Sequence, residues 1–92
     1  MIVRISGEDQ YELDDGEAER VNELERAVIA TVDGGRPEEF PAAYAALVEH
    51  VRSAGSALGD DDLRGSDVIL PPADISFAEA GREFTGDGLI PD

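Results

Sequence analysis

The sequence has no cysteine and no lysine, and each absence excludes a class of function. Without cysteine there are no disulfides, no thiolate zinc sites and no cysteine nucleophiles. Without lysine a phosphate-binding loop of the GxxxxGK[ST] type is excluded, and no GxGxxG motif follows a strand. No apolar run approaches the ~20 residues of a membrane-spanning helix, and the N-terminus lacks the pattern of a signal peptide. We therefore expect a cytoplasmic protein that binds no nucleotide through either common motif.

Aromatic residues are scarce, and positive charge is far outweighed by negative charge. Aromatics make up 5% of the 92 residues, and much of the 41% hydrophobic fraction is alanine, so we expect one domain with a thin core. The net charge is −15, and all seven basic residues are arginine. Such a surface repels phosphate backbones and anionic lipids, so direct contact with nucleic acid or membrane is not expected. GC-rich coding and adaptation to high salt both fit this composition, and the sequence leaves that choice open.

Residues 1–14 predict a β-hairpin. Val3 and Ile5 share one face of a first strand, and the polar corner that begins at Gly7 permits a turn. Tyr11 and Leu13 then alternate with a polar residue, as in a half-buried return strand. An isolated hairpin is marginal in water, so its apolar face must pack on another element.

Two amphipathic helices, over residues 16–33 and 38–58, are predicted to supply that surface. The first has apolar residues at three- and four-residue steps, with Glu25 expected largely on the opposite side. Its stripe is Val21, Leu24, Val28 and Val32. The stripe of the second helix is Phe40, Tyr44, Leu47, Val48 and Val51, with a further extension to Leu58 as an option. The short glycine-containing connection favours an antiparallel pair.

The last third of the chain predicts an acidic loop over 59–66 and a mixed segment over 67–92. The run "DVIL" at 67–70 predicts either a third strand beside the hairpin or an extended segment that crosses the core. Ser76 can cap a short helix whose inward residues would be Phe77, Ala80 and Phe84. The whole chain therefore predicts a single α+β domain, in which a hairpin packs on an antiparallel helix pair with a short C-terminal helix.

No residue pattern indicates catalysis or a bound ion. His50, the only histidine, is expected to be a partly exposed helix residue without a nucleophile beside it. The acidic loop that begins at Asp60 fails as a calcium loop, because Arg64 stands at its fifth position and Pro71 at its twelfth. The abundant carboxylates are interpreted as a solvated face. We expect no catalytic residue, no cofactor and no metal site, and hence no enzyme.

Three segments are better suited to binding a partner than to chemistry. One is an apolar strand that stops at a double proline, one is an apolar tail, and one is the edge of the hairpin, since an open strand can accept another strand. Core packing is the alternative for the first two. The candidate partner-binding residues are Ile2 and Arg4; Ile69, Leu70, Pro71 and Pro72; and Leu89 and Ile90.

The order of these pieces resembles the PspA-associated protein family, PspAA. The hairpin "MIVRI" with "QYE" leads into the acidic helix "VNELERAV", and the alanine-rich helix "AAYAALVEHVR" follows. The sequence then has "SDVILPPADISFAEA" and closes on "GLIPD". The resemblance spans the chain from residue 1 to residue 92, and none of its motifs is a catalytic signature.

The resemblance implies a non-enzymatic accessory of the phage-shock, or envelope-stress, response. Such a protein would associate with a PspA-like coiled-coil protein and reach the inner face of the membrane only through that partner. The family supplies no binding residues to carry over to this chain. The alternative function is an acidic regulator that binds a basic partner, for example as a nucleic-acid mimic. The sequence leaves open whether the chain forms a homodimer and which surface meets the partner.

Overall fold

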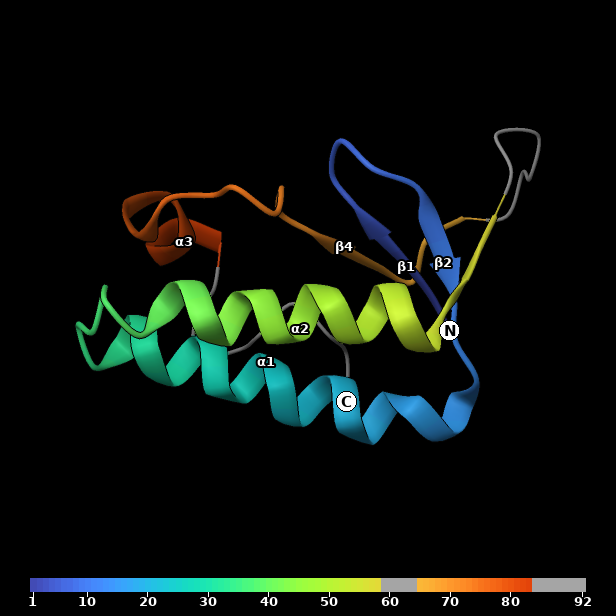
Figure 1. Ribbon diagram of the computed structural model, residues 1–92, viewed down its shortest axis with the longest axis horizontal. Helices are drawn as coiled ribbons and strands as arrows, with labels where there is room; N and C mark the ends of the chain where they lie inside the picture. Colours follow the sequence, from blue (N-terminus) through green and yellow to red (C-terminus); the bar gives the residue numbers. More distant parts are fainter. Residues whose placement is uncertain (59–64, 84–92) are drawn as a thin grey trace.

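The computed structural model shows a four-stranded sheet packed on one side of two antiparallel helices (Figure 1). The structure describes residues 1–58 and 65–83. The presence of this sheet beside separate helices confirms the predicted α+β class. The strands are β1 (Ile2–Ile5), β2 (Gln10–Glu12), β3 (Ser56–Ala57) and β4 (Val68–Leu70). The helical elements are the 3-10 turn η1 (Asp15–Glu17) and the helices α1 (Ala18–Asp33), α2 (Phe40–Ala54) and α3 (Phe77–Glu83).

The predicted hairpin is formed by β1 and β2, which pair antiparallel. Gly7 has a φ of 81°, a conformation that costs glycine little, and the Glu8 N–H closes the turn on the Ile5 carbonyl at 2.8 Å. The inward residues Val3, Ile5 and Leu13 are at most 2% exposed, and Tyr11 is half-buried against them. The hairpin thus buries the face that its alternation predicted.

The segment at 67–70 joins the sheet and does not cross the core. β4 pairs with β1 in parallel, and the strand order is β3-β2-β1-β4. Asp67 starts this pairing, because its carboxylate accepts a hydrogen bond from the Ile2 N–H at 2.8 Å and its own N–H donates to the Ile2 carbonyl at 2.8 Å. β1 is consequently an inner strand with a neighbour on each side.

Helix α1 begins and ends close to its predicted bounds, with two differences. One turn of 3-10 helix precedes it, and the side chain of Asp14 makes no capping hydrogen bond. Glu25, expected on the outer side, is only 4% exposed. It lies four residues after Val21 and three before Val28, so the helical repeat places it within the apolar stripe. At the other end Gly35 has a φ of 62°, as expected for a glycine that terminates a helix.

Helix α2 ends four residues earlier than predicted. All five residues of its predicted stripe are buried. At Gly55, however, the backbone becomes extended, with φ −91° and ψ 159°, and the next two residues form β3 on the far side of β2. β3 escaped prediction because two small residues carry no alternation of their own. Leu58 is therefore not a helical residue.

The C-terminal helix α3 starts as predicted. Ser76 and Glu79 form a reciprocal cap, in which the Glu79 N–H donates to the Ser76 hydroxyl oxygen at 3.2 Å. Ala80 is fully buried, and the Phe77 ring meets Phe40 edge-on with ring centres 5.9 Å apart. Phe84, residues 59–64 of the loop predicted over 59–66, and the predicted apolar tail lie outside the described residues.

Candidate interaction surface

Across residues 1–58 and 65–83, no group of three or more histidine, aspartate or glutamate side chains is arranged to hold a metal ion. Within these same residues every buried side-chain nitrogen or oxygen has a hydrogen-bond partner.

The sheet has one face toward the helices and one face away from them. The inward face includes Val3, Ile5, Val68 and Leu70, which all belong to the core. Because side chains alternate along a strand, Arg4 and Ile69 lie on the outward face, and the parallel register sets them opposite each other. Ile69 is 58% exposed and is the one large hydrophobic side chain exposed within the described residues.

The structure separates the candidate partner-binding residues into three groups. Arg4, Ile69 and Pro72 are exposed. Ile2 is 7% exposed, Leu70 is fully buried, and Pro71 is also buried. Leu89 and Ile90 fall outside the described residues. Of the six candidates that lie within the described residues, Arg4 and Ile69 are the two that pair side by side on the outward face.

The prediction that the edge of the hairpin at Ile2 and Arg4 is open is wrong. Ile2 and Arg4 do not lie on an open strand edge, because β4 pairs with β1 along that side. The sequence could not show this, since "DVIL" fitted two conformations equally well. Among the described strands, β4 forms the edge on this side of the sheet.

The segment after β4 is anchored to the helices, which favours core packing for Leu70 and Pro71. The hydroxyl of Tyr44, in α2, donates a hydrogen bond to the carbonyl of Pro71. Both Tyr44 and Leu70 lie in the core. The strand therefore leaves the sheet along a fixed path, and Ile69 is held with its side chain outward.

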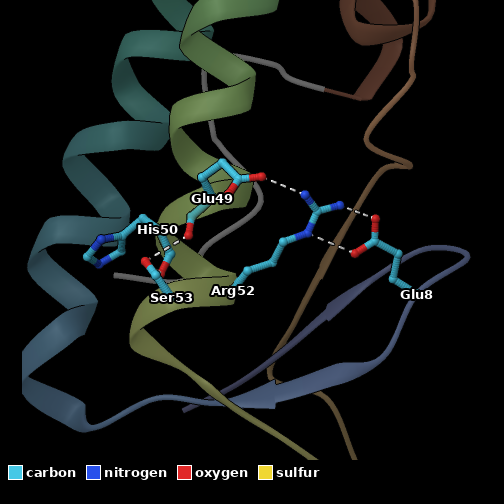
Figure 2. Close-up of polar contacts among 5 residues, drawn as sticks. All are labelled: Glu8, Glu49, His50, Arg52 and Ser53. Atoms are coloured by element: carbon cyan, nitrogen blue, oxygen red, sulfur yellow. Dashed lines mark hydrogen bonds and ion pairs between the residues drawn. The ribbon is translucent and has the colours of Figure 1, made fainter.

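An ion-pair cluster that the sequence did not reveal ties the hairpin to α2 (Figure 2). The Arg52 guanidinium donates two hydrogen bonds to the carboxylate of Glu8, which stands in the hairpin turn, and a third to Glu49 at 2.6 Å. These hydrogen bonds, first that of Glu8, raise the pKa of Arg52 above its usual value. The fixed fork of an arginine suits such two-oxygen pairing. This cluster holds the turn against the helix that carries the sheet.

His50 also has a structural position. Its Nε2 lies 2.8 Å from a carboxylate oxygen of Glu17, in the turn before α1, and its side chain is 23% exposed. The pair joins the C-terminal half of α2 to the start of α1. His50 is thus the partly exposed helix residue that the sequence predicted.

None of the helices in the described segments has the length and apolar character required to cross a bilayer.

Comparison with known proteins gives one finding at the level of family. A family model described as PspAA, PspA-associated protein, matches residues 1–92. No curated protein and no solved structure matches the chain.

Proposed function

The chain belongs to the PspA-associated protein family, and from this membership we propose that it is a non-enzymatic adaptor of a PspA-like coiled-coil protein. It would bind that protein during the membrane, or phage-shock, stress response and regulate its assembly. The family match over residues 1–92 is the observation that carries this proposal. The name of the family connects it with PspA, and the adaptor role is our inference.

The distribution of polar groups supports an adaptor over an enzyme. The ion pairs of Arg52 and His50 connect elements of the fold to one another. The outward face of the sheet, by contrast, presents the side chain of Ile69, which is 58% exposed. It lies on a strand with an edge that no described strand pairs with, so a partner strand could cover it.

The charge of the chain bears on how it would reach the membrane. At a net charge of −15 it is repelled by anionic headgroups. We therefore propose that it works in the cytoplasm and reaches the inner face of the membrane only through its partner. Direct binding to nucleic acid is disfavoured for the same reason.

Capture of partners from the native cell tests this proposal. The tagged chain should recover a PspA-family protein from cells under envelope stress, and recover less of it from unstressed cells. A charge-matched control is needed because an acidic bait retains basic proteins nonspecifically. A second acidic protein of similar net charge should not recover the PspA-family protein. Recovery of unrelated proteins alone would contradict the adaptor function.

The net charge also favours a second function, that of an acidic regulator that occupies the binding face of a basic protein as a nucleic-acid mimic. The two functions differ in their dependence on salt. A mimic acts through many exposed charges, so its affinity should fall steeply between low and moderate salt. An adaptor that covers apolar surface should retain most of its affinity over the same range.

A further inference from the structure

β4 is the outermost strand on its side of the sheet, and no strand within residues 1–58 and 65–83 pairs with its far edge. The hydrogen bonds of β1 show which backbone groups of β4 face that edge. Met1 and Leu13 exchange both of their backbone hydrogen bonds, at 2.9 and 2.8 Å. The backbone N–H and carbonyl groups of odd-numbered residues of β1 therefore point toward β2, and those of even-numbered residues point toward β4. Consistently, the Ser6 N–H donates to the Leu70 carbonyl at 2.9 Å.

Ile69 directs its backbone toward the open edge. Backbone groups of successive strand residues point to alternate sides, so the N–H and carbonyl of Ile69 point away from β1 when those of Leu70 point toward it. The accepting stretch is short. Pro71 has no N–H, and its carbonyl already accepts the Tyr44 hydroxyl. The edge thus offers one donor and one acceptor, centred on the exposed side chain of Ile69.

The opposite edge of the sheet lacks this combination. β3 has two residues, Ser56 and Ala57, and both are exposed. Neither presents a large apolar side chain that a partner strand could cover. Of the two edge strands in the described part of the sheet, β4 is therefore the better acceptor for another strand.

We propose that the open edge of β4 at Ile69 receives an extended, basic segment of the PspA-like partner. The inference rests on the proposed adaptor function and names its contact surface. The incoming segment forms hydrogen bonds with the backbone of Ile69 and covers the side chain of Ile69 with an apolar residue.

Charge around the edge defines the rest of that segment. Asp67 and Asp74 flank β4 and are exposed, and the chain as a whole attracts positive groups. Arg4 lies beside Ile69 on the outward face and disfavours a positive residue directly opposite Ile69. The recognised segment is therefore apolar at its centre and carries arginine or lysine toward its ends.

A second copy of the chain fits this edge poorly. Two molecules of charge −15 repel each other. A basic partner removes the repulsion.

Two substitutions at Ile69 test the edge in the full-length chain. Ile69→Pro removes the outward N–H and leaves the groups that pair with β1. Ile69→Lys places a positive charge where an apolar residue should be covered. Ala45→Lys, at an exposed position of α2, is the matched control because it changes the net charge equally. The probe is the purified PspA-family protein of the same organism, titrated at physiological salt, with circular dichroism to confirm that each variant is folded.

We expect both Ile69 variants to bind at least about tenfold more weakly, while Ala45→Lys binds as the wild type does. Ile69→Pro loses one backbone hydrogen bond and the covered side chain, and Ile69→Lys loses the covered side chain. If the PspA-family protein binds all variants equally, the edge is not the contact surface, although the adaptor function stands. If it binds none of them, including the wild type, both proposals are overturned. If the wild type instead dimerises and Ile69→Lys does not, the occupant is a second copy and this inference is wrong.

Discussion

At the scale of single residues, Gly55 determines where the second helix stops and the sheet begins. A Cβ at this position would lie 2.7 Å from the Val51 carbonyl oxygen and 2.8 Å from the Cβ of Tyr11. Neither neighbour is the flexible end of a side chain. The φ of −91° is open to any residue, so close packing explains the glycine and backbone strain does not.

Gly55→Ala should therefore destabilise the protein, although alanine ordinarily stabilises a chain by reducing the entropy of its unfolded state. We expect a loss of about 1–3 kcal/mol, as for other overpacked sites. Gly16→Ala is the control, since a Cβ there meets nothing within 4 Å, and its effect should stay within about 0.5 kcal/mol. Urea unfolding of the two variants measures both. A Gly55→Ala protein as stable as the wild type would contradict the close approach.

At the scale of elements, β4 is the strand on which the architecture and the proposed contact both depend. Its three residues alternate between buried, exposed and buried, with Leu70 in the core and Ile69 outside. The parallel register with β1 produces this alternation. A segment that crossed the core would bury all three side chains.

Alanine substitutions along β4 should reproduce that alternation. Leu70→Ala should cost about 2–5 kcal/mol of the free energy of unfolding, because it leaves a cavity in the core. Ile69→Ala should cost less than about 1 kcal/mol, because its side chain is largely solvated. Thermal or urea unfolding gives both values. Equal losses at the two positions would mean that the register is wrong.

The sequence predicted best those elements whose residue pattern repeats within a short stretch of the chain. The stripe of α2 repeats over three turns, and all five of its residues are buried. The pairing of β4 with β1 joins residues 65 positions apart, as between Ile2 and Asp67, and no local pattern encodes it. For the same reason Ile69 could not be separated in advance from Leu70 and Pro71. Alternation shows that two neighbours face opposite ways, but only the register shows which one is outside.

At the scale of the whole molecule, negative charge is the dominant property. The molecule extends 39 × 25 × 21 Å, while the Debye length falls from roughly 30 Å at 0.01 M salt to about 8 Å at 0.15 M. At low salt most of the carboxylates therefore repel one another across the fold. At physiological salt only near neighbours do so.

The melting temperature should consequently rise as sodium chloride increases from 0.01 to 0.15 M. Each kcal/mol that screening restores shifts the melting temperature of a domain of this size by roughly 4–8 °C. A variant with Glu19→Gln and Glu38→Gln, two exposed positions, carries less repulsion and should show a smaller rise. Differential scanning calorimetry measures the melting temperature. A melting temperature that is independent of salt would show that self-repulsion does not limit stability.

The central claim is that this acidic α+β domain exists to contact a PspA-like partner through one edge of its sheet. Amide hydrogen exchange, with and without the purified PspA-family protein, tests it residue by residue. The account predicts that the partner slows exchange of the Ile69 amide, which points outward, while the amides of Val68 and Leu70 are already protected by β1. Unchanged exchange at every amide of the chain, with the partner in excess, would contradict it.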